Sequence, residues 1–375
     1  MSEYQYYEFQ AVDRPLSGGD RQALRDLSTR ARITATSFTN TYEWGDFKGD
    51  PAHLMERWFD LHLYLANWGT RRLMIRLPKR LVDLRRLEDF LGEIDWVTVR
   101  VAGEHLILDI TRDEVAPGDD WDDGSGWLAA LSPLRADLLA GDLRLYYLLW
   151  LTAVEAEDVE ADSLEPAPGI GPLTGQLRAF ADFFGLDRDL VAAAAEKVCE
   201  SSTISPNAAR QVISSLSDRE RSELLLRLHE GELHLAGELR AMVRARGASG
   251  DPSPNAARTV GELKSRALAI RLARERDDAA RAAAEQRRQA AEAATAREAR
   301  LLAIARRGEG VWRDVEGEIA RGSASAYDRA AILLFDLQAV AGERGTMSEF
   351  TKRLQSIRER HARKSRFIER LAELG

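Results

Sequence analysis

The sequence predicts an α+β protein, with an N-terminal mixed α/β sandwich domain, an all-α middle region, a long charged helix and a C-terminal helical hairpin module. Three observations support this prediction. Runs rich in aromatic and β-branched residues alternate with helical patterns only in roughly the first 110 residues. From residue 126 onward the apolar residues recur at helical spacing, and one later stretch holds almost nothing but alanine and charged residues. We therefore expect domains at 1–115 and 126–245, the latter with a linker near 162–172, a charged helix at 259–306 and a module at 308–375.

The N-terminal domain combines predicted strands with predicted helices. Aromatic and β-branched residues predict strands at 4–12, 33–42, 71–77, 96–101 and 106–111. Apolar residues three and four apart predict helices at 23–27, 51–65 and 81–90, the first capped by Ser17 or Asp20. In the strand at 71–77, apolar residues alternate with Arg72, Met74 and Arg76, which indicates one buried face. We expect the helices to lie on one face of the sheet.

The middle region is predicted to consist of helices separated by segments rich in Gly and Pro. Gly141 and Asp142 form the expected corner of a helical hairpin made by 128–139 and 143–154. The prolines and glycines of 163–172 predict a linker, and a second linker is expected at 246–254. Between these linkers, amphipathic patterns predict helices at 173–184, 190–198, 206–216 and 219–243.

The stretch at 259–306 predicts a long charged helix. Between Leu272 and Leu301 the only apolar residues are alanines, and opposite charges stand four apart, as in Arg281 and Glu285. An unbroken helix of this span would be roughly 70 Å long. Asp277 occupies the next heptad position after Ile270, so no sustained coiled coil is predicted. A solvated rod, a loose alanine-seamed pairing and partial disorder all stay open.

The C-terminal module is expected to contain three or four short helices, within 311–319, 327–340, 347–359 and 363–374. Two of them carry apolar stripes that would pack as a hairpin. The stripes are Tyr327, Ala331, Leu334 and Leu337 on one helix, and Phe350, Leu354 and Ile357 on the other.

Composition and charge limit the cellular compartment and the kinds of partner that we expect for this protein. The 375-residue chain has a net charge of -8, but 259–375 carries 24 basic and 18 acidic residues, and 1–258 carries 29 basic and 43 acidic residues. Most of the N-terminal surface would therefore repel a polyanion. Cys199 is the only cysteine, so no intramolecular disulfide can form, and we expect it to be a small buried hydrophobe. The chain shows no secretory signal and no spanning segment, which predicts a cytoplasmic protein without membrane contact.

An aromatic and acidic loop is the first candidate binding site. Trp44, Asp46, Phe47 and Lys48 lie in a connection between a strand and a helix, and Trp68 lies in a later turn. In the alternative interpretation Trp44 and Phe47 plug the edge of the core and Asp50 caps the following helix. An enzyme with an unfamiliar site at Asp46, Lys48 and Trp68 is a further alternative.

Basic residues form the second candidate, a phosphate or nucleic-acid contact. Arg72 and Arg76 share the polar face of a predicted strand, where they could grip phosphates. Alternatively, these side chains belong to a solvated face and pair with neighbouring acids. The same hypothesis includes two arginines of the next helix and three residues of the tail: Arg85, Arg86, Arg363, Lys364 and Arg366.

The glycine-rich stretch and the histidine pair of the middle region do not have the spacing of known cofactor-binding or metal-binding motifs. Gly169 to Gly175 is out of register for a dinucleotide fingerprint, and Pro172 removes an amide that a phosphate cradle would use. His229 and His234 are five apart, whereas helical metal pairs are four apart. We therefore expect no metal and no cofactor.

Two stretches carry a resemblance to known proteins. Residues 44–51 and 64–72 resemble a family of uncharacterised bacterial proteins, which implies no activity. The tail from Tyr327 to Lys364 is similar to tails of bacterial SWIM zinc-finger proteins, although the zinc ligands of those proteins are missing here. The resemblance implies a shared docking module.

These observations favour a protein that is not an enzyme. We expect an adaptor or scaffold that mediates protein–protein interaction in a bacterial multi-protein system and binds its protein partner through the C-terminal helical module. The alternative is a nucleic-acid-associated component of a bacterial defence or mobile-element system.

Overall fold

The computed structural model describes residues 3–92, 94–116, 121–167, 169–197, 206–247, 257–372 and 374. The chain divides into two compact units, Met1–Ala273 and Arg274–Gly375. The first unit contains a seven-stranded antiparallel sheet followed by helices, and the second is helical, so the predicted α+β class is confirmed. Cys199 and most of the second predicted linker lie outside the described residues.

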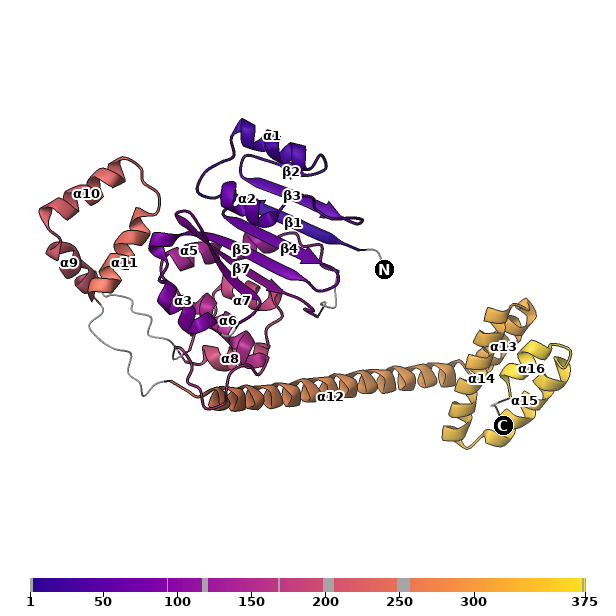
Figure 1. Ribbon diagram of the computed structural model, residues 1–375. Helices are drawn as coiled ribbons and strands as arrows, with labels where there is room; N and C mark the ends of the chain where they lie inside the picture. Colours follow the sequence, from indigo (N-terminus) through magenta and orange to yellow (C-terminus); the bar gives the residue numbers. More distant parts are fainter. Residues whose placement is uncertain are drawn as a thin grey trace. The chain divides into compact units, whose positions relative to one another are not determined.

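The sheet has the strand order β2-β3-β1-β4-β5-β7-β6 (Figure 1). Strand β1 therefore lies between β3 and β4, and Gln5 pairs with Tyr42 on one side and with Ala66 on the other. The strands predicted at 96–101 and 106–111 are confirmed as β6 and β7, which form a hairpin around Gly103. The strands are β1 Gln5–Gln10, β2 Arg32–Ile33, β3 Ser37–Tyr42, β4 Leu61–Ala66, β5 Arg71–Pro78, β6 Val97–Ala102 and β7 His105–Arg112.

The predicted helix at 51–65 is wrong in its second half. Helix α2, Pro51–Arg57, ends before Trp58, and Leu61–Ala66 is the central strand β4. Leu61 and Leu65 are four apart and fit a helical stripe, but with Leu63 between them they also fit the two-residue period of a strand. Pairing with β1 and β5 on both sides satisfies the backbone of this segment as a strand. The strand predicted at 33–42 is likewise divided into β2 and β3.

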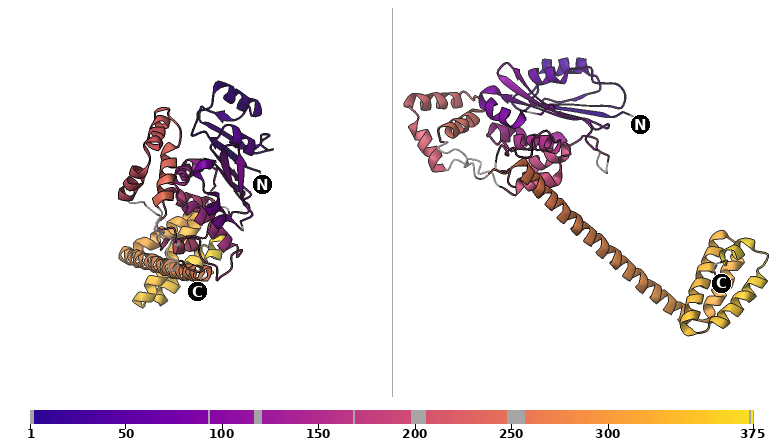
Figure 2. Two further views of the ribbon diagram at one scale, coloured as in Figure 1. Left: turned by 60° about the vertical axis from the view of Figure 1, so that its left-hand side comes forward. Right: turned by 60° about the horizontal axis from the view of Figure 1, so that its bottom comes forward.

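Helices cover both faces of the sheet, so the expectation that they lie on one face is wrong (Figure 2). Helix α1, Gly18–Leu27, and helix α2 pack on the face that contains Phe9, Phe38 and Met74. Met74 is buried, so β5 is covered on both sides. The opposite face packs against the remaining helices of the sheet region: α3 Leu84–Leu91, α4 Trp127–Leu131, α5 Pro133–Leu139, α6 Arg144–Glu155, α7 Gly175–Phe183 and α8 Arg188–Ala195.

The segment predicted as the linker 162–172 is packed into the first unit. Leu164 forms a β-bridge with Thr259, and Ile170 is buried. Glu165 is also buried and forms an ion pair with Arg258, with 3.0 Å between Oε2 and Nη2. Because one hydrophobic core contains both the sheet and helices α4 to α8, the core continues across the boundary predicted between 115 and 126.

Three helices follow in the same unit: α9 Pro206–Ser215, α10 Asp218–His229 and α11 Leu235–Gly247. The single helix predicted at 219–243 is therefore two helices. Gly231 and His234, in the connection between them, adopt positive φ angles of 73° and 65°, which end a right-handed helix.

The long charged helix is confirmed as α12, Val260–Arg307. Val260 and Leu263 are buried in the core of the first unit, and Leu301 and Ile304 are buried in the core of the second. Every residue from 275 to 300 is exposed. The middle of α12 is therefore polar and solvated on all sides.

The second unit contains the four predicted helices, as α13 Glu309–Arg321, α14 Ala324–Arg344, α15 Met347–Arg360 and α16 Ser365–Arg370. The two predicted stripes share one hydrophobic core, and α14 contacts α15, so the predicted hairpin is confirmed. No helix in the described part of the chain is both long and apolar enough to span a membrane.

Candidate functional site

The aromatic and acidic loop is partly core and partly surface. Phe47 is buried among other aromatic rings, and the carboxylate of Asp50 accepts a hydrogen bond from the backbone N–H of Ala52 at 2.9 Å. The alternative interpretation is therefore confirmed for Phe47 as a core residue and for Asp50 as the cap of the following helix. Trp44 is 75% exposed, so its expected role as a plug of the core is wrong. Oδ1 of Asp46 accepts a hydrogen bond from Nε2 of Gln5 at 2.9 Å, and Lys48 is exposed.

The predicted phosphate-binding arginines of β5 pair with carboxylates of the same unit. Arg72 donates from Nε and Nη2 to the two oxygens of Asp109, at 2.8 and 2.6 Å. Arg76 donates from Nη2 to Oδ1 of Asp60 at 2.8 Å and from Nη1 to the backbone oxygen of Met55 at 3.0 Å. These guanidinium groups therefore pair with neighbouring acids, as the alternative interpretation expects. The face that carries them is covered rather than solvated, because the side chains of Arg72 and Arg76 are only 24% and 12% exposed.

The other basic candidates lie in separate elements. Arg85 and Arg86 are exposed on α3, and Arg363 and Arg366 are exposed near α16. Lys364 donates from Nζ to the backbone oxygen of Ile319 at 2.6 Å, so it holds α13 within the second unit. The structure places the strand and tail candidates in different compact units.

Sequence reasoning missed a buried polar network that centres on Asp60. The side chain of Asp60 is fully buried, and its Oδ2 accepts the backbone N–H groups of Val12 and Asp13 at 2.7 and 2.9 Å. Its Oδ1 lies 2.8 Å from Nη2 of Arg76 and 3.6 Å from Nη2 of Arg135. A buried carboxylate needs such compensation for its lost hydration. The only signal in the sequence is a single aspartate between Phe59 and Leu61.

Asp13 extends the network toward the surface. Arg135, on α5, donates two hydrogen bonds to the Asp13 carboxylate, at 2.8 and 2.6 Å. Nε2 of His234 lies 2.9 Å from Oδ2 of Asp13. Burial acts to raise the pKa of Asp13, but the hydrogen bonds and charge of Arg135, together with those of His234, hold it below its ordinary value. Asp13 is therefore ionised at neutral pH.

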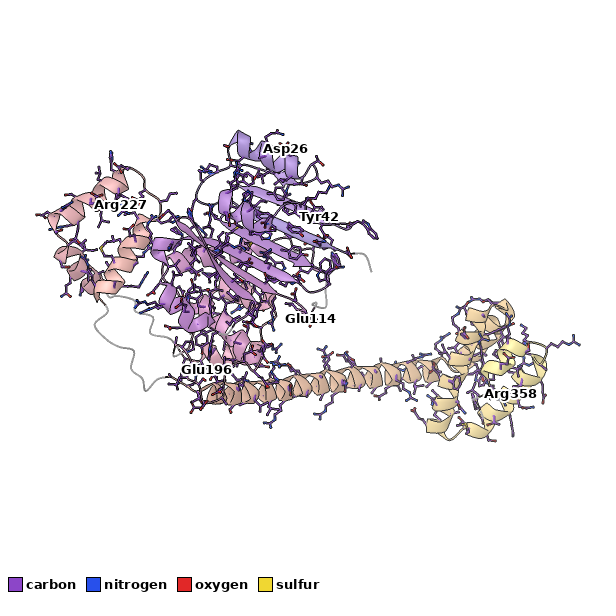
Figure 3. All side chains as sticks on the ribbon, viewed as in Figure 1. Asp26, Tyr42, Glu114, Glu196, Arg227 and Arg358 are labelled. Atoms are coloured by element: carbon purple, nitrogen blue, oxygen red, sulfur yellow. The ribbon has the colours of Figure 1, made fainter. Side chains whose placement is uncertain are left out.

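A cavity of about 470 Å³ adjoins this network, with walls from the segment before α1, from α2, from the β6–β7 hairpin and from the connection between α10 and α11. Arg80 lines it and donates from Nη2 to the backbone oxygen of Leu233 at 3.0 Å. Arg227, labelled in Figure 3, pairs with both Glu232 and Glu238. Arg80, which follows β5, thus attaches the α10–α11 connection to the sheet region, whereas Arg227 joins α10 to that connection and to α11. Asp46, Lys48 and Trp68 are not among the residues that line this cavity.

The second unit carries a groove around Trp312, which is half-buried. Two adjoining cavities, of about 330 and 360 Å³, share Glu309, Trp312 and Arg353 in their walls. The guanidinium of Arg353 lies 5.3 Å from the centre of the Trp312 ring and pairs with Glu309. We call the surface formed by Glu309, Trp312, Glu316, Arg353 and Arg360 the Trp312 groove. Arginine and tryptophan are the residues on which protein interfaces most often depend.

Comparison with family models, with curated proteins and with solved structures finds no match to this chain. The two resemblances found in the sequence therefore stay predictions. Among the residues that the structure describes, no three His, Cys, Asp or Glu side chains gather where they could hold a metal ion.

Proposed function

We propose that the protein is an adaptor of a bacterial multi-protein system, which binds a protein partner through its C-terminal helical unit. The observation that supports this most directly is helix α12, which is exposed at every residue from 275 to 300. A helix that is polar on all sides is typical of a solvated connection between domains. Each of its ends is buried in a different hydrophobic core.

The Trp312 groove is the proposed docking surface of the second unit. Its floor is the half-buried indole of Trp312, which packs on Phe350 with 5.9 Å between ring centres. Its rim is charged: Arg353 pairs with Glu309, and Arg360 pairs with Glu316 at 2.8 Å. An aromatic floor within a polar rim is the usual composition of a transient protein interface.

Affinity capture of the tagged full-length protein tests this function. The bait is expressed in a bacterial cell, and the extract is divided so that one half is treated with nuclease and the other is not. The retained proteins are identified and quantified by mass spectrometry, and retained nucleic acid is measured in the untreated half. Arg353→Glu places a carboxylate beside Glu309 and removes the cation from the Trp312 ring. We expect it to reduce the captured partner by roughly tenfold or more.

Lys352→Glu is the matched control, because it makes the same type of charge change at the neighbouring position of α15. Lys352 lies with Met347, Ser348 and Gln355 on another surface of that helix. A partner that both variants retain equally would show that the groove is not the docking surface. Recovery of nucleic acid without a stoichiometric protein would overturn the adaptor function, and would favour the exposed Arg363 and Arg366 as phosphate contacts.

A further inference from the structure

Three tryptophans are exposed at one end of the sheet. Trp44 is 75% exposed, Trp68 is 50% exposed and Trp121 is 69% exposed. Tryptophan is normally well buried, because its ring offers a large apolar area. Exposed apolar side chains that gather in one place mark interaction sites, whereas single ones carry no meaning. The position of these three residues relative to one another therefore decides their significance.

The topology of the sheet brings them together. Gln5 of β1 pairs with Tyr42 of β3 and with Ala66 of β4. Trp44 follows Tyr42 by two residues and Trp68 follows Ala66 by two, so both lie just beyond the same end of the two strands that flank β1. Tyr42 is labelled at this end of the sheet in Figure 3.

Trp121 joins the same end through Tyr4, the residue before β1. The rings of Tyr4 and Trp121 are 5.2 Å apart between centres, in an edge-to-face arrangement. The backbone N–H of Asn67 donates to the backbone oxygen of Tyr4 at 3.0 Å, and the backbone N–H of Tyr4 donates to Oδ1 of Asn67 at 3.1 Å. Tyr4 thus connects Trp121 to the turn that carries Trp68. We call the surface formed by Tyr4, Trp44, Trp68 and Trp121 the tryptophan end.

The turn that carries Trp68 is held in a defined geometry. Nε1 of Trp68 donates to Oγ1 of Thr70 at 3.0 Å, and that hydroxyl donates to Oδ1 of Asp113 at 2.6 Å. Gly69 has a φ of 100°, and a side chain there would meet the backbone oxygen of Val115 at 2.8 Å. A surface that is ordered before binding loses less entropy when a partner docks.

Carboxylates surround the tryptophan end. Glu43 and Asp46 flank Trp44, and Asp113 and Glu114 follow β7 beside the Trp68 turn. The hydroxyl of Tyr4 donates to the backbone oxygen of Asp123 at 2.9 Å. Burial, followed by the negative charges of Asp123, Asp122 and Glu43, raises the pKa of Tyr4, which places these three carboxylates within electrostatic reach of its ring.

Basic side chains compensate this charge only in part. Arg71 is buried, and its Nη2 lies 3.4 Å from Oδ2 of Asp122. Lys48 is exposed in the loop that carries Trp44. The exposed rings thus lie in a field that is negative overall, which attracts cations and repels polyanions.

We propose that the tryptophan end binds an arginine- or lysine-rich segment of a protein partner. The guanidinium or ammonium groups of that segment lie over the exposed indole faces, which attract cations more strongly than other aromatic rings do. The surrounding carboxylates supply the counter-charges and therefore favour a partner segment of positive charge. This surface belongs to the first unit and is separate from the Trp312 groove, so it adds a second binding site to the proposed adaptor.

Peptide binding to the purified full-length protein tests this proposal without reference to any cellular partner. The probe is a fluorescein-labelled peptide of alternating glycine with arginine and lysine, followed by fluorescence anisotropy. Trp44→Ala/Trp121→Ala removes two exposed rings and leaves every carboxylate in place. We expect it to weaken binding roughly tenfold, and Glu43→Gln/Asp46→Asn to weaken it by a similar factor and to reduce its salt dependence.

The control variant is Leu225→Ala/Leu228→Ala, which removes two exposed apolar side chains from α10 of the same unit. It should bind the peptide as the wild type does, and circular dichroism should show that all variants are folded. Equal binding by the wild type and the tryptophan variant would overturn the proposal, as would equal binding of a peptide with glutamine in place of arginine and lysine. Tighter binding of a neutral oligosaccharide than of the basic peptide would also overturn it.

Discussion

Replacement of Arg258 by methionine should destabilise the first unit strongly. Arg258 lies two residues before the start of α12, and its Nε and Nη2 donate to the buried carboxylate of Glu165. Its Nη1 donates to the backbone oxygen of Ala193 at 2.8 Å. Removal of the cation leaves the buried carboxyl group of Glu165 without its counter-charge, with the hydroxyl of Tyr147 as its remaining side-chain partner at 2.6 Å.

The expected magnitude follows from the burial of the pair. The side chain of Glu165 has 0% exposure and that of Arg258 has 10%. Breaking a pair that is buried to this extent costs about 3–5 kcal/mol. For a unit of this size the loss corresponds to a fall in Tm of roughly 6–20 °C.

Tryptophan fluorescence during thermal unfolding is a suitable assay, because Trp312 is the only one of the eight tryptophans outside the first unit. Arg266→Met is the matched control, since Arg266 lies in the first turns of α12, close to Arg258 in the sequence, and pairs with Glu196 in solvent, at 52% and 40% exposure. It should cost less than about 1 kcal/mol. Adding Glu165→Gln to Arg258→Met should recover part of the lost stability, because a neutral amide is less costly to bury. The reasoning is refuted if Arg258→Met costs no more than Arg266→Met.

Three further predictions concern pH and backbone geometry. Burial, and then the charge of Arg72, lower the pKa of His62 to about 3, so stability should fall by about 1.4 kcal/mol per unit as the pH drops from 6.5 toward 3. The free energy of unfolding, measured with urea at several pH values in this range, should change less steeply with pH for His62→Gln than for the wild type. An equal pH dependence would show that His62 is not the group responsible. The pKa of Asp13 lies below its ordinary value, so its stabilising effect is complete above the unfolded pKa near 3.9 and is lost as the pH falls through the folded pKa. Asp13→Asn should therefore cost stability at pH 7 but almost none at pH 2, and an equal cost at both would argue against the network. Gly69→Ala should lower stability by roughly 1–3 kcal/mol, because its φ of 100° and its approach to Val115 both exclude a side chain, and a Tm within 1 °C of the wild type would show that the turn adapts.

Local patterns were sufficient for the helical second unit. The stripes that begin at Tyr327 and Phe350 pack into one core, and α12 forms from alanine and alternating charges. In such segments the period of the apolar residues and the helix propensity agree, and no distant strand competes for the backbone. The core position of Phe47 and the cap formed by Asp50 could likewise be predicted from neighbouring residues.

The candidate sites were predicted less completely, because they depend on residues that are far apart in the sequence. Arg72 and Arg76 were identified as neighbours on one strand, but their partners Asp109 and Asp60 come from other elements. The Asp13 and Arg135 pair joins residues 122 positions apart. No periodic pattern marks such pairs.

The sequence by itself determined the α+β class, the positions of most helices and the polar character of α12. Only the tertiary structure decided that Leu61–Ala66 is a strand, that both faces of the sheet are covered, and that Glu165 is part of a packed segment. It also brought Trp44, Trp68 and Trp121 to one end of the sheet, through the pairing of β1 with β3 and β4. The physical reason is that a helix satisfies its hydrogen bonds within itself, whereas a strand and a buried charge obtain theirs from distant segments.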